Sequence, residues 1–188
     1  PRWRSCQKED LGASAISTCH HDHVGALPVA LRYFPKAHVV LPEQSYFIIE
    51  RVLHNSVNVM QAKRIEHGIA EYPLFEHRDL DRIVEAFEAR GIERPFDLDR
   101  DGTMRAMFHD AGHILGSVGV TIEAEGKRVM YTGDVNFEHS TLQKGALFPE
   151  EHVDALIVET TRGAQARAAD YDRRNEEDAF AEAILRVI

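Results

Sequence analysis

The chain has 188 residues, 44% of them hydrophobic and 28% charged, which is enough to bury one sizeable core. Its formal net charge of −9 argues against a generally basic, nucleic-acid-coating surface, although a local basic groove stays possible. No stretch reaches the roughly 18 apolar residues of a membrane-spanning helix, and no signal peptide is recognised in the first dozen residues. The two cysteines, Cys6 and Cys19, are too few for a disulfide framework, so we expect a reducing, cytoplasmic setting.

The first quarter of the chain predicts short strands that alternate with helices. Residues 13–17 (ASAIS) are typical of a buried strand, and residues 24–34 predict a short helix that tolerates Pro28 in its first turn. Residues 38–41 (HVVL) predict a second strand. A longer helix should open directly afterwards at Pro42, because proline suits the first helical position.

A further helix is predicted over residues 79–90, where Gly91 is well placed to end it. The apolar residues of this segment recur with the period of one helical face, and they are Leu80, Ile83, Val84 and Phe87. Four aromatic residues of the first quarter also occupy apolar faces, namely Tyr33, Phe34, Tyr46 and Phe47. We interpret these four as core residues rather than as platforms for stacking nucleic-acid bases.

The second half of the chain changes to the period of strands. Strands are predicted at residues 103–108, 118–124 and 127–132, and Glu125-Gly126 between the last two is a tight-hairpin signal. Residues 153–159 predict a further, buried strand. Strands and helices that alternate in this way favour an α/β layered fold.

The C-terminal part of the chain is more polar. Residues 162–174 are the one segment typical of a linker or mobile loop. Residues 175–188 predict a helix with an apolar stripe made of Phe180, Ile184 and Ile188.

The sharpest chemical feature is the run STCHHDHVGALP at residues 17–28. It places three imidazoles and one carboxylate within four residues, His20 to His23, directly after a predicted strand. Histidine nitrogens and aspartate oxygens are suitable ligands for zinc. An accidental, solvated histidine cluster is the alternative reading of this motif alone.

Three weaker features follow predicted strands further along the chain. His113 stands among glycines, which leave room for a close approach to a metal, although a loop histidine can also bond backbone groups. Asp134 follows Thr132-Gly133 and is a candidate bridging ligand, although aspartate is also common in turns. Glu159 ends the last predicted strand. Ligand-type residues at the ends of successive strands are typical of sites in α/β proteins.

Together these motifs resemble the metallo-β-lactamase superfamily. The run ending DHVGALP is similar to its signature, His-x-His-x-Asp-His followed by glycine. AGHILGS, YTGD and LIVETTRG are similar to successive motifs of the RNA- and DNA-processing branch, the β-CASP nucleases. The resemblance extends over residues 13–163.

The resemblance implies an αββα metallo-β-lactamase sandwich, of which this chain holds the first half, and a centre of up to two zinc ions. It assigns His20 and His113 to the first metal site, Asp22 and His23 to the second, and Asp134 to the bridge between them. Asp22 would also orient the nucleophile or accept its proton. Glu159 falls on the acidic residue of the first β-CASP-specific motif.

The sequence departs from the family pattern in ways that shape the expectations. Thr18 stands where the signature has its first histidine. The cap domain, the second half of the sandwich and the last metal-binding histidine have no counterpart in residues 1–188. We therefore expect residues 1–163 to form the metallo-β-lactamase-type region and residues 164–188 to lead towards a missing cap. Further ligands would come from a missing portion of the chain or from a homo-oligomer, and the chain alone should have little nuclease activity.

The function implied by the resemblance is hydrolysis of RNA, or less readily of single-stranded DNA, by zinc-activated water. Two alternatives stay open. One is a non-catalytic scaffold or binding subunit with a decayed metal site, which Thr18 favours. The other is a hydrolase of small esters or thioesters on the same fold.

Among the neighbouring residues, Cys19 is interpreted as a small buried residue and His21 as a poor substitute ligand, because adjacent side chains rarely point at one ion. His109 and His139 are interpreted as surface or supporting groups beside the motifs.

Overall fold

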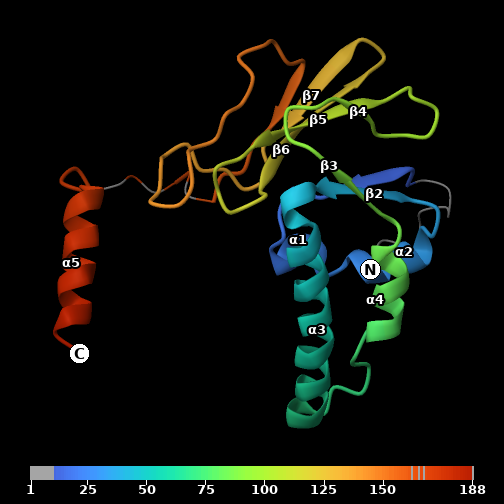
Figure 1. The fold of residues 1–188 in the computed structure, drawn as a ribbon, viewed down its shortest axis with the longest axis horizontal. Coiled ribbons are helices and arrows are strands. Elements are labelled where there is room, and N and C mark those ends of the chain that lie inside the picture. Colours follow the sequence, from blue (N-terminus) through green and yellow to red (C-terminus); the bar gives the residue numbers. More distant parts are fainter. Residues whose placement is uncertain (1–10, 162, 165, 167, 188) are drawn as a thin grey trace.

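A computed structural model describes residues 11–161, 163–164, 166 and 168–187. Cys6, Ile188 and part of the predicted linker lie outside the described residues. Figure 1 shows two β-sheets next to each other, with the helices of the first half of the chain beside the smaller sheet. No helix among the described residues is long and apolar enough to cross a membrane.

The smaller sheet has three parallel strands in the order β1-β2-β3, formed by Ala13–Ala15, His38–Pro42 and Phe87–Arg90. Its central strand is buried on both faces. Val39 and Leu41 pack in a cluster with the helices, whereas Val40 packs in a second cluster with residues of the larger sheet. Because strand side chains alternate between faces, this pattern puts the small sheet between the helices and the large sheet.

The helices of the first half are α1 (His21–Val24), α2 (Leu27–Tyr33), α3 (Tyr46–His67) and α4 (His77–Val84). Pro28 lies in the first turn of α2, as predicted. The predicted helix start at Pro42 is wrong, because Pro42 is extended and ends β2, and a 3₁₀ turn (η2, Glu43–Ser45) precedes α3.

The helix predicted over residues 79–90 is wrong in its second half. The helix α4 begins behind a capping box of Glu76 and Asp79 and ends at Val84, and Phe87 begins β3. Phe87 nevertheless buries its ring in the same cluster as Leu80. The apolar spacing therefore predicted correctly that Leu80 and Phe87 share one core. It did not predict the backbone of Phe87, which is extended because β3 pairs with β2.

The larger sheet has the order β4-β5-β6-β7-β8. Its strands are Phe96–Asp97, Arg105–Asp110, Val118–Ala124, Lys127–Tyr131 and Ala155–Ile157. The predicted hairpin between β6 and β7 is confirmed, with left-handed φ angles of 51° at Glu125 and 73° at Gly126. The two-residue strand β4 was not predicted, and β8 adds to β7 in parallel.

Two predictions of burial are wrong. Residues 153–159 hold only the three-residue strand β8, and its residues are exposed, with Leu156 at 58%. Tyr33 and Phe47 are exposed as well, whereas Phe34 is buried.

The C-terminal helix α5 (Arg173–Leu185) forms as predicted but buries none of its residues, and Figure 1 shows it standing apart from the sheets. The division into residues 1–163 and 164–188 stays a prediction.

Candidate metal centre

His20 and His23 are placed by the turn that follows β1. His20 is the N-cap residue of α1, and its carbonyl oxygen accepts hydrogen bonds from the backbone N–H groups of His23 (3.0 Å) and Val24 (3.1 Å). Residues three apart on a helical turn lie on the same side of it. The turn therefore sends both imidazoles towards one point.

His113 lies in the loop between β5 and β6. The hydroxyl of Ser117 accepts hydrogen bonds from the backbone N–H groups of His113 (3.1 Å) and Ile114 (3.0 Å). Gly112 has a φ of +64°, and a Cβ atom there would lie 2.4 Å from the carbonyl oxygen of Asn136. Only glycine allows this close approach, so Gly112 makes room for the neighbouring backbone, and the predicted role of glycines in the approach to a metal stays a prediction.

Asp134 follows β7 across another constrained glycine. Gly133 has a φ of +59°, and a Cβ atom there would lie 2.9 Å from the carbonyl oxygen of Val118 and 3.0 Å from Cβ of Ser17. This contact brings the end of β7 against the segment that follows β1. Asp134 is thereby carried from the large sheet to the histidines of the small sheet.

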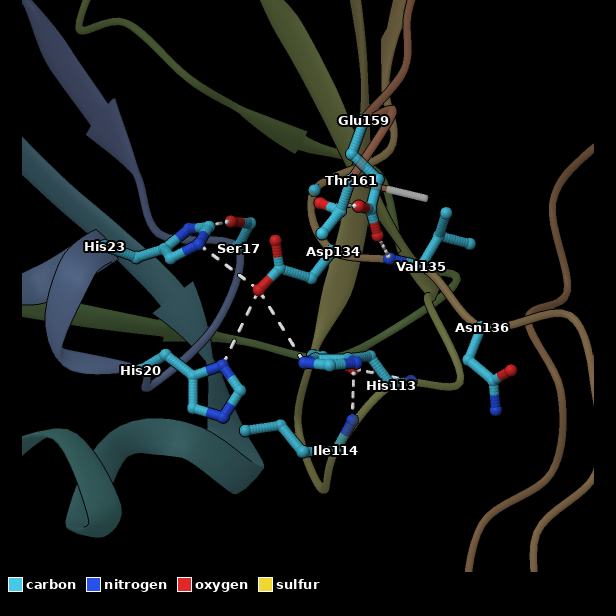
Figure 2. A network of polar contacts seen from close by, with 12 residues as sticks. Ser17, His20, His23, His113, Ile114, Asp134, Val135, Asn136, Glu159 and Thr161 are labelled. Atoms are coloured by element: carbon cyan, nitrogen blue, oxygen red, sulfur yellow. Dashed lines mark hydrogen bonds and ion pairs between the residues drawn. The ribbon is translucent and has the colours of Figure 1, made fainter. Parts of the chain in front are cut away.

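The three histidines converge on a single oxygen of Asp134, as Figure 2 shows. Asp134 Oδ2 lies 3.3 Å from His23 Nε2, 3.5 Å from His20 Nδ1 and 3.7 Å from His113 Nε2. The rings of His20 and His113 meet edge to face at 5.1 Å. Behind His23, the hydroxyl of Ser17 lies 3.3 Å from Nδ1 and helps to direct Nε2 at Asp134.

Asp22 lies at the margin of this group. Its Oδ2 is 3.7 Å from His23 Nε2, and its side chain is 81% exposed. The structure thus brings together four of the five residues predicted to bind metal and leaves Asp22 on the solvent side of His23.

The donor set fits a divalent transition-metal ion. One ligand atom each of His20, His113 and Asp134 can be chosen so that all three lie within 4.8 Å of one another. Imidazole nitrogens and carboxylate oxygens are the ordinary protein ligands of zinc besides cysteine. The assignment of these residues as metal ligands nevertheless stays a prediction.

Glu159 supports the backbone beside Asp134. Its carboxylate accepts hydrogen bonds from the N–H of Val135 (2.9 Å) and the hydroxyl of Thr161 (2.5 Å). The hydrogen bond from Thr161, followed by that from Val135, holds the pKa of Glu159 below its usual range, and the nearby His113 acts in the same direction. Since Val135 follows Asp134 directly, Glu159 helps to fix the position of that carboxylate.

Thr18 is fully buried, and its hydroxyl has no hydrogen-bond partner among the residues that the structure describes. A buried hydroxyl without a partner costs roughly 1–3 kcal/mol of stability. The hydroxyl group of Thr18 is thus unfavourable at this buried position.

The neighbouring residues follow the sequence interpretation only in part. His21 turns to α3, where its Nδ1 lies 3.2 Å from Ser56 Oγ, and Cys19 is buried, which raises the pKa of its thiol. Of the two roles considered for His109, that of a surface group is wrong, and that of a supporting group stays a prediction. Its ring is 1% exposed and lies between Glu93 (2.9 Å) and Thr121 (2.8 Å).

Sequence reasoning missed Ser17 as a partner of His23, because a serine ahead of a motif carries no spacing signal of its own. It also missed Phe137, which lines a cleft of about 710 Å³ together with His113, Asp134 and Glu159. Phe137 follows Asp134 by three residues. The sequence does not show that its side chain is exposed and lines this cleft, and only the fold does.

Comparison with known proteins gives this geometry a context. A family model for the metallo-beta-lactamase superfamily matches residues 16–183. The chain is 29% identical to cleavage and polyadenylation specificity factor subunit 3 of Dictyostelium discoideum, over 95% of this chain and 22% of that protein. It is 28% identical to an RNase J-like protein of Methanocaldococcus jannaschii, over 82% of this chain and 32% of that protein.

A third relative is the transcription termination factor FttA of Cenarchaeum symbiosum, with 26% identity over 97% of this chain and 27% of that protein. The chain therefore spans less than a third of the length of each of these three relatives. The matched region includes the whole candidate centre, from His20 to Asp134. The chain belongs to the metallo-β-lactamase superfamily, and its distant homologues are β-CASP RNA-processing nucleases.

Proposed function

We propose that this chain forms the metal-binding part of a zinc-dependent nuclease that cleaves phosphodiester bonds of RNA. The observation that carries the proposal is the convergence of three histidine nitrogens on Asp134 Oδ2, at distances of 3.3–3.7 Å. The names of relatives, such as the RNase J-like protein, support RNA as the substrate. Because the chain spans less than a third of those relatives, cleavage by the chain alone should be weak.

Zinc, when bound, lowers the pKa of a coordinated water towards neutrality and so supplies a hydroxide nucleophile at cellular pH. His20, His113 and Asp134 would hold the first ion, and His23 and Asp22 with Asp134 would hold a second. The exposed carboxylate of Asp22 faces solvent, where it would orient the nucleophile or accept its proton. Ser17 and Glu159 would keep His23 and Asp134 in place.

Zinc titration of the full chain tests the centre, with His113→Ala as the probe variant. We expect His113→Ala to weaken zinc binding at least about 10-fold, because it removes a nitrogen donor. His67→Ala is the matched control, since His67 is 62% exposed at the end of α3. Equal zinc affinities of the two variants would contradict the assignment of His113.

RNA cleavage by the zinc-loaded chain tests the chemistry. We expect slow cleavage of single-stranded RNA that disappears in Asp134→Asn. Hydrolysis of small esters without cleavage of RNA would instead favour an esterase on the same fold.

One observation favours a second candidate function. Thr18 holds a position where the family signature has a ligand, and its buried hydroxyl is unsatisfied among the described residues. A scaffold subunit with a decayed centre would have this feature. Zinc binding too weak to measure would favour that function over the nuclease.

A further inference from the structure

Phe137 presents a large aromatic ring at the wall of the candidate centre. Its side chain is 66% exposed, and it lines the same cleft as His113 and Asp134. A single exposed apolar side chain is common on protein surfaces. This one differs because it stands beside a cluster of ligand-type residues and because its backbone is held in place.

The backbone of Asn136 and Phe137 is held on both sides. The N–H of Asn136 donates to the carbonyl oxygen of Ala111 (2.9 Å), and the N–H of Ala146 donates to that of Asn136 (2.8 Å). A Cβ atom on Gly145 would lie 2.3 Å from the carbonyl oxygen of Phe137. These contacts fix the backbone from which the ring of Phe137 projects.

The same contacts connect Phe137 to the metal centre. Ala111 and Gly112 precede His113 directly, and Gly112 also accepts a hydrogen bond from the side chain of Asn136 (3.3 Å). The loop that positions His113 and the segment that presents Phe137 are thus held together. The ring of Phe137 rests edge to face on Phe148, with ring centres 5.8 Å apart, which orients it.

The charges in the cleft limit what can hold a nucleic-acid strand there. Among the described residues that line it, none is lysine or arginine, and Asp22, Asp134 and Glu159 are acidic. Side-chain cations, which usually supply affinity for phosphates, are missing from this described lining. Polar side chains of this lining, such as Thr160, can bond to phosphate or sugar oxygens, whereas the exposed ring of Phe137 is the group that can stack on a base.

We propose that Phe137 forms a stacking subsite for an unpaired nucleobase of single-stranded RNA beside the bond cleaved at the metal centre. The inference rests on the proposed nuclease function and deepens it. An unpaired base offers its face to the ring, whereas the bases of a duplex are already stacked on one another. The subsite therefore selects single strands without selecting a sequence.

Binding of labelled oligoadenylate RNA to the zinc-loaded full chain tests the subsite. Phe137→Leu keeps an apolar side chain and removes the aromatic face, so we expect binding about 10-fold weaker, with Phe137→Trp at least as tight as the native chain. Leu142→Ala is the matched control, because Leu142 is 96% exposed and lies outside the cleft lining. With RNA that has one abasic position, the difference in RNA affinity between the native chain and Phe137→Leu should be smaller.

Zinc content measured in parallel separates this proposal from the assignment of the centre. Native RNA affinity in zinc-loaded Phe137→Leu, equal affinity for duplex and single-stranded RNA, or no RNA binding at all would overturn the subsite. Loss of RNA affinity in Phe137→Leu, combined with native zinc content in His113→Ala, would support the subsite and overturn the proposed metal centre.

Discussion

At the scale of single residues, the carboxylate of Asp134 is the group around which the centre is arranged. The three histidines reach it through two separate local structures. The α1 turn positions His20 and His23, and the Ser117 hydroxyl fixes the loop of His113. Because these structures lie in separate parts of the chain, a change in the loop of His113 should affect that ligand alone, whereas a change in the α1 turn should affect His20 and His23 together.

Thr18 allows a direct test of the resemblance to the family signature. We expect Thr18→His to raise zinc affinity at least about 10-fold, because an imidazole nitrogen binds zinc far better than a hydroxyl does. Zinc titration of both forms gives the measurement. Thr18→Leu controls for the larger side-chain volume at this fully buried position. Equal zinc affinities of Thr18→His and Thr18→Leu would contradict the alignment of Thr18 with the missing histidine.

Glu159 should contribute a pH-dependent part of the stability. Its pKa is lowered from the ordinary 4.5 in the folded chain. The ionised carboxylate therefore adds stability above about pH 4.5, and this stability is lost as the pH falls through the lower folded pKa. In chemical denaturation of the zinc-free protein, Glu159→Gln should lose less stability in that range than the native chain does. An unchanged acid dependence would contradict a stabilising role for the ionised carboxylate.

At the scale of elements, the loop between β5 and β6 depends on Gly112. Both Gly112→Ala and Gly126→Ala place a side chain in a left-handed conformation, which costs about 1 kcal/mol. Only at Gly112 would the new Cβ atom meet backbone atoms, at 2.4 Å, because nothing lies within 4 Å of the corresponding position at Gly126. We expect the Gly112 variant to lose more stability in chemical denaturation and to lose zinc affinity, and the Gly126 variant to keep its zinc affinity.

The helix α5 should be the least protected helix. It has 13 residues and buries none of them, and isolated helices of about that length are marginal in water. The longer α3 buries Leu53 and Val57 completely. Amide hydrogen exchange should therefore be fast throughout α5 and slow in the middle of α3. Equal protection of the two helices would show that α5 packs against something in solution.

The sequence predicted the strand-end positions of His20, His23, His113 and Asp134 because histidines, glycines and the hairpin signal are local features. It failed where tertiary pairing decided the outcome. Phe87 continues the helical spacing of apolar residues that precede it, but it lies in β3 because that segment pairs with β2. Ser17 and Phe137 could not be singled out, because the roles we give them depend on what the fold brings beside them.

At the scale of the whole molecule, the candidate centre closes between two sheets. His20 and His23 follow β1 of the small sheet, whereas His113 and Asp134 come from loops of the large sheet. Zinc should therefore raise the free energy of unfolding by about 2.7 kcal/mol when its free concentration is about 100 times the Kd. Denaturation with and without zinc measures this effect, and His113→Ala, with zinc binding at least about 10-fold weaker, should reduce it to about 1.4 kcal/mol or less. The same increase in His113→Ala would place the bound ion elsewhere.

The two sheets are also contiguous in the sequence. The small sheet is complete by Arg90, and the large sheet begins at Phe96. A cut between these residues would yield two fragments, each carrying two of the four converging side chains. Apolar contacts such as that of Val40 with the large sheet would favour their reassembly, and a zinc ion bound as proposed would add an intermolecular cross-link. We expect the complementation of such a split pair to increase with the concentration of free zinc.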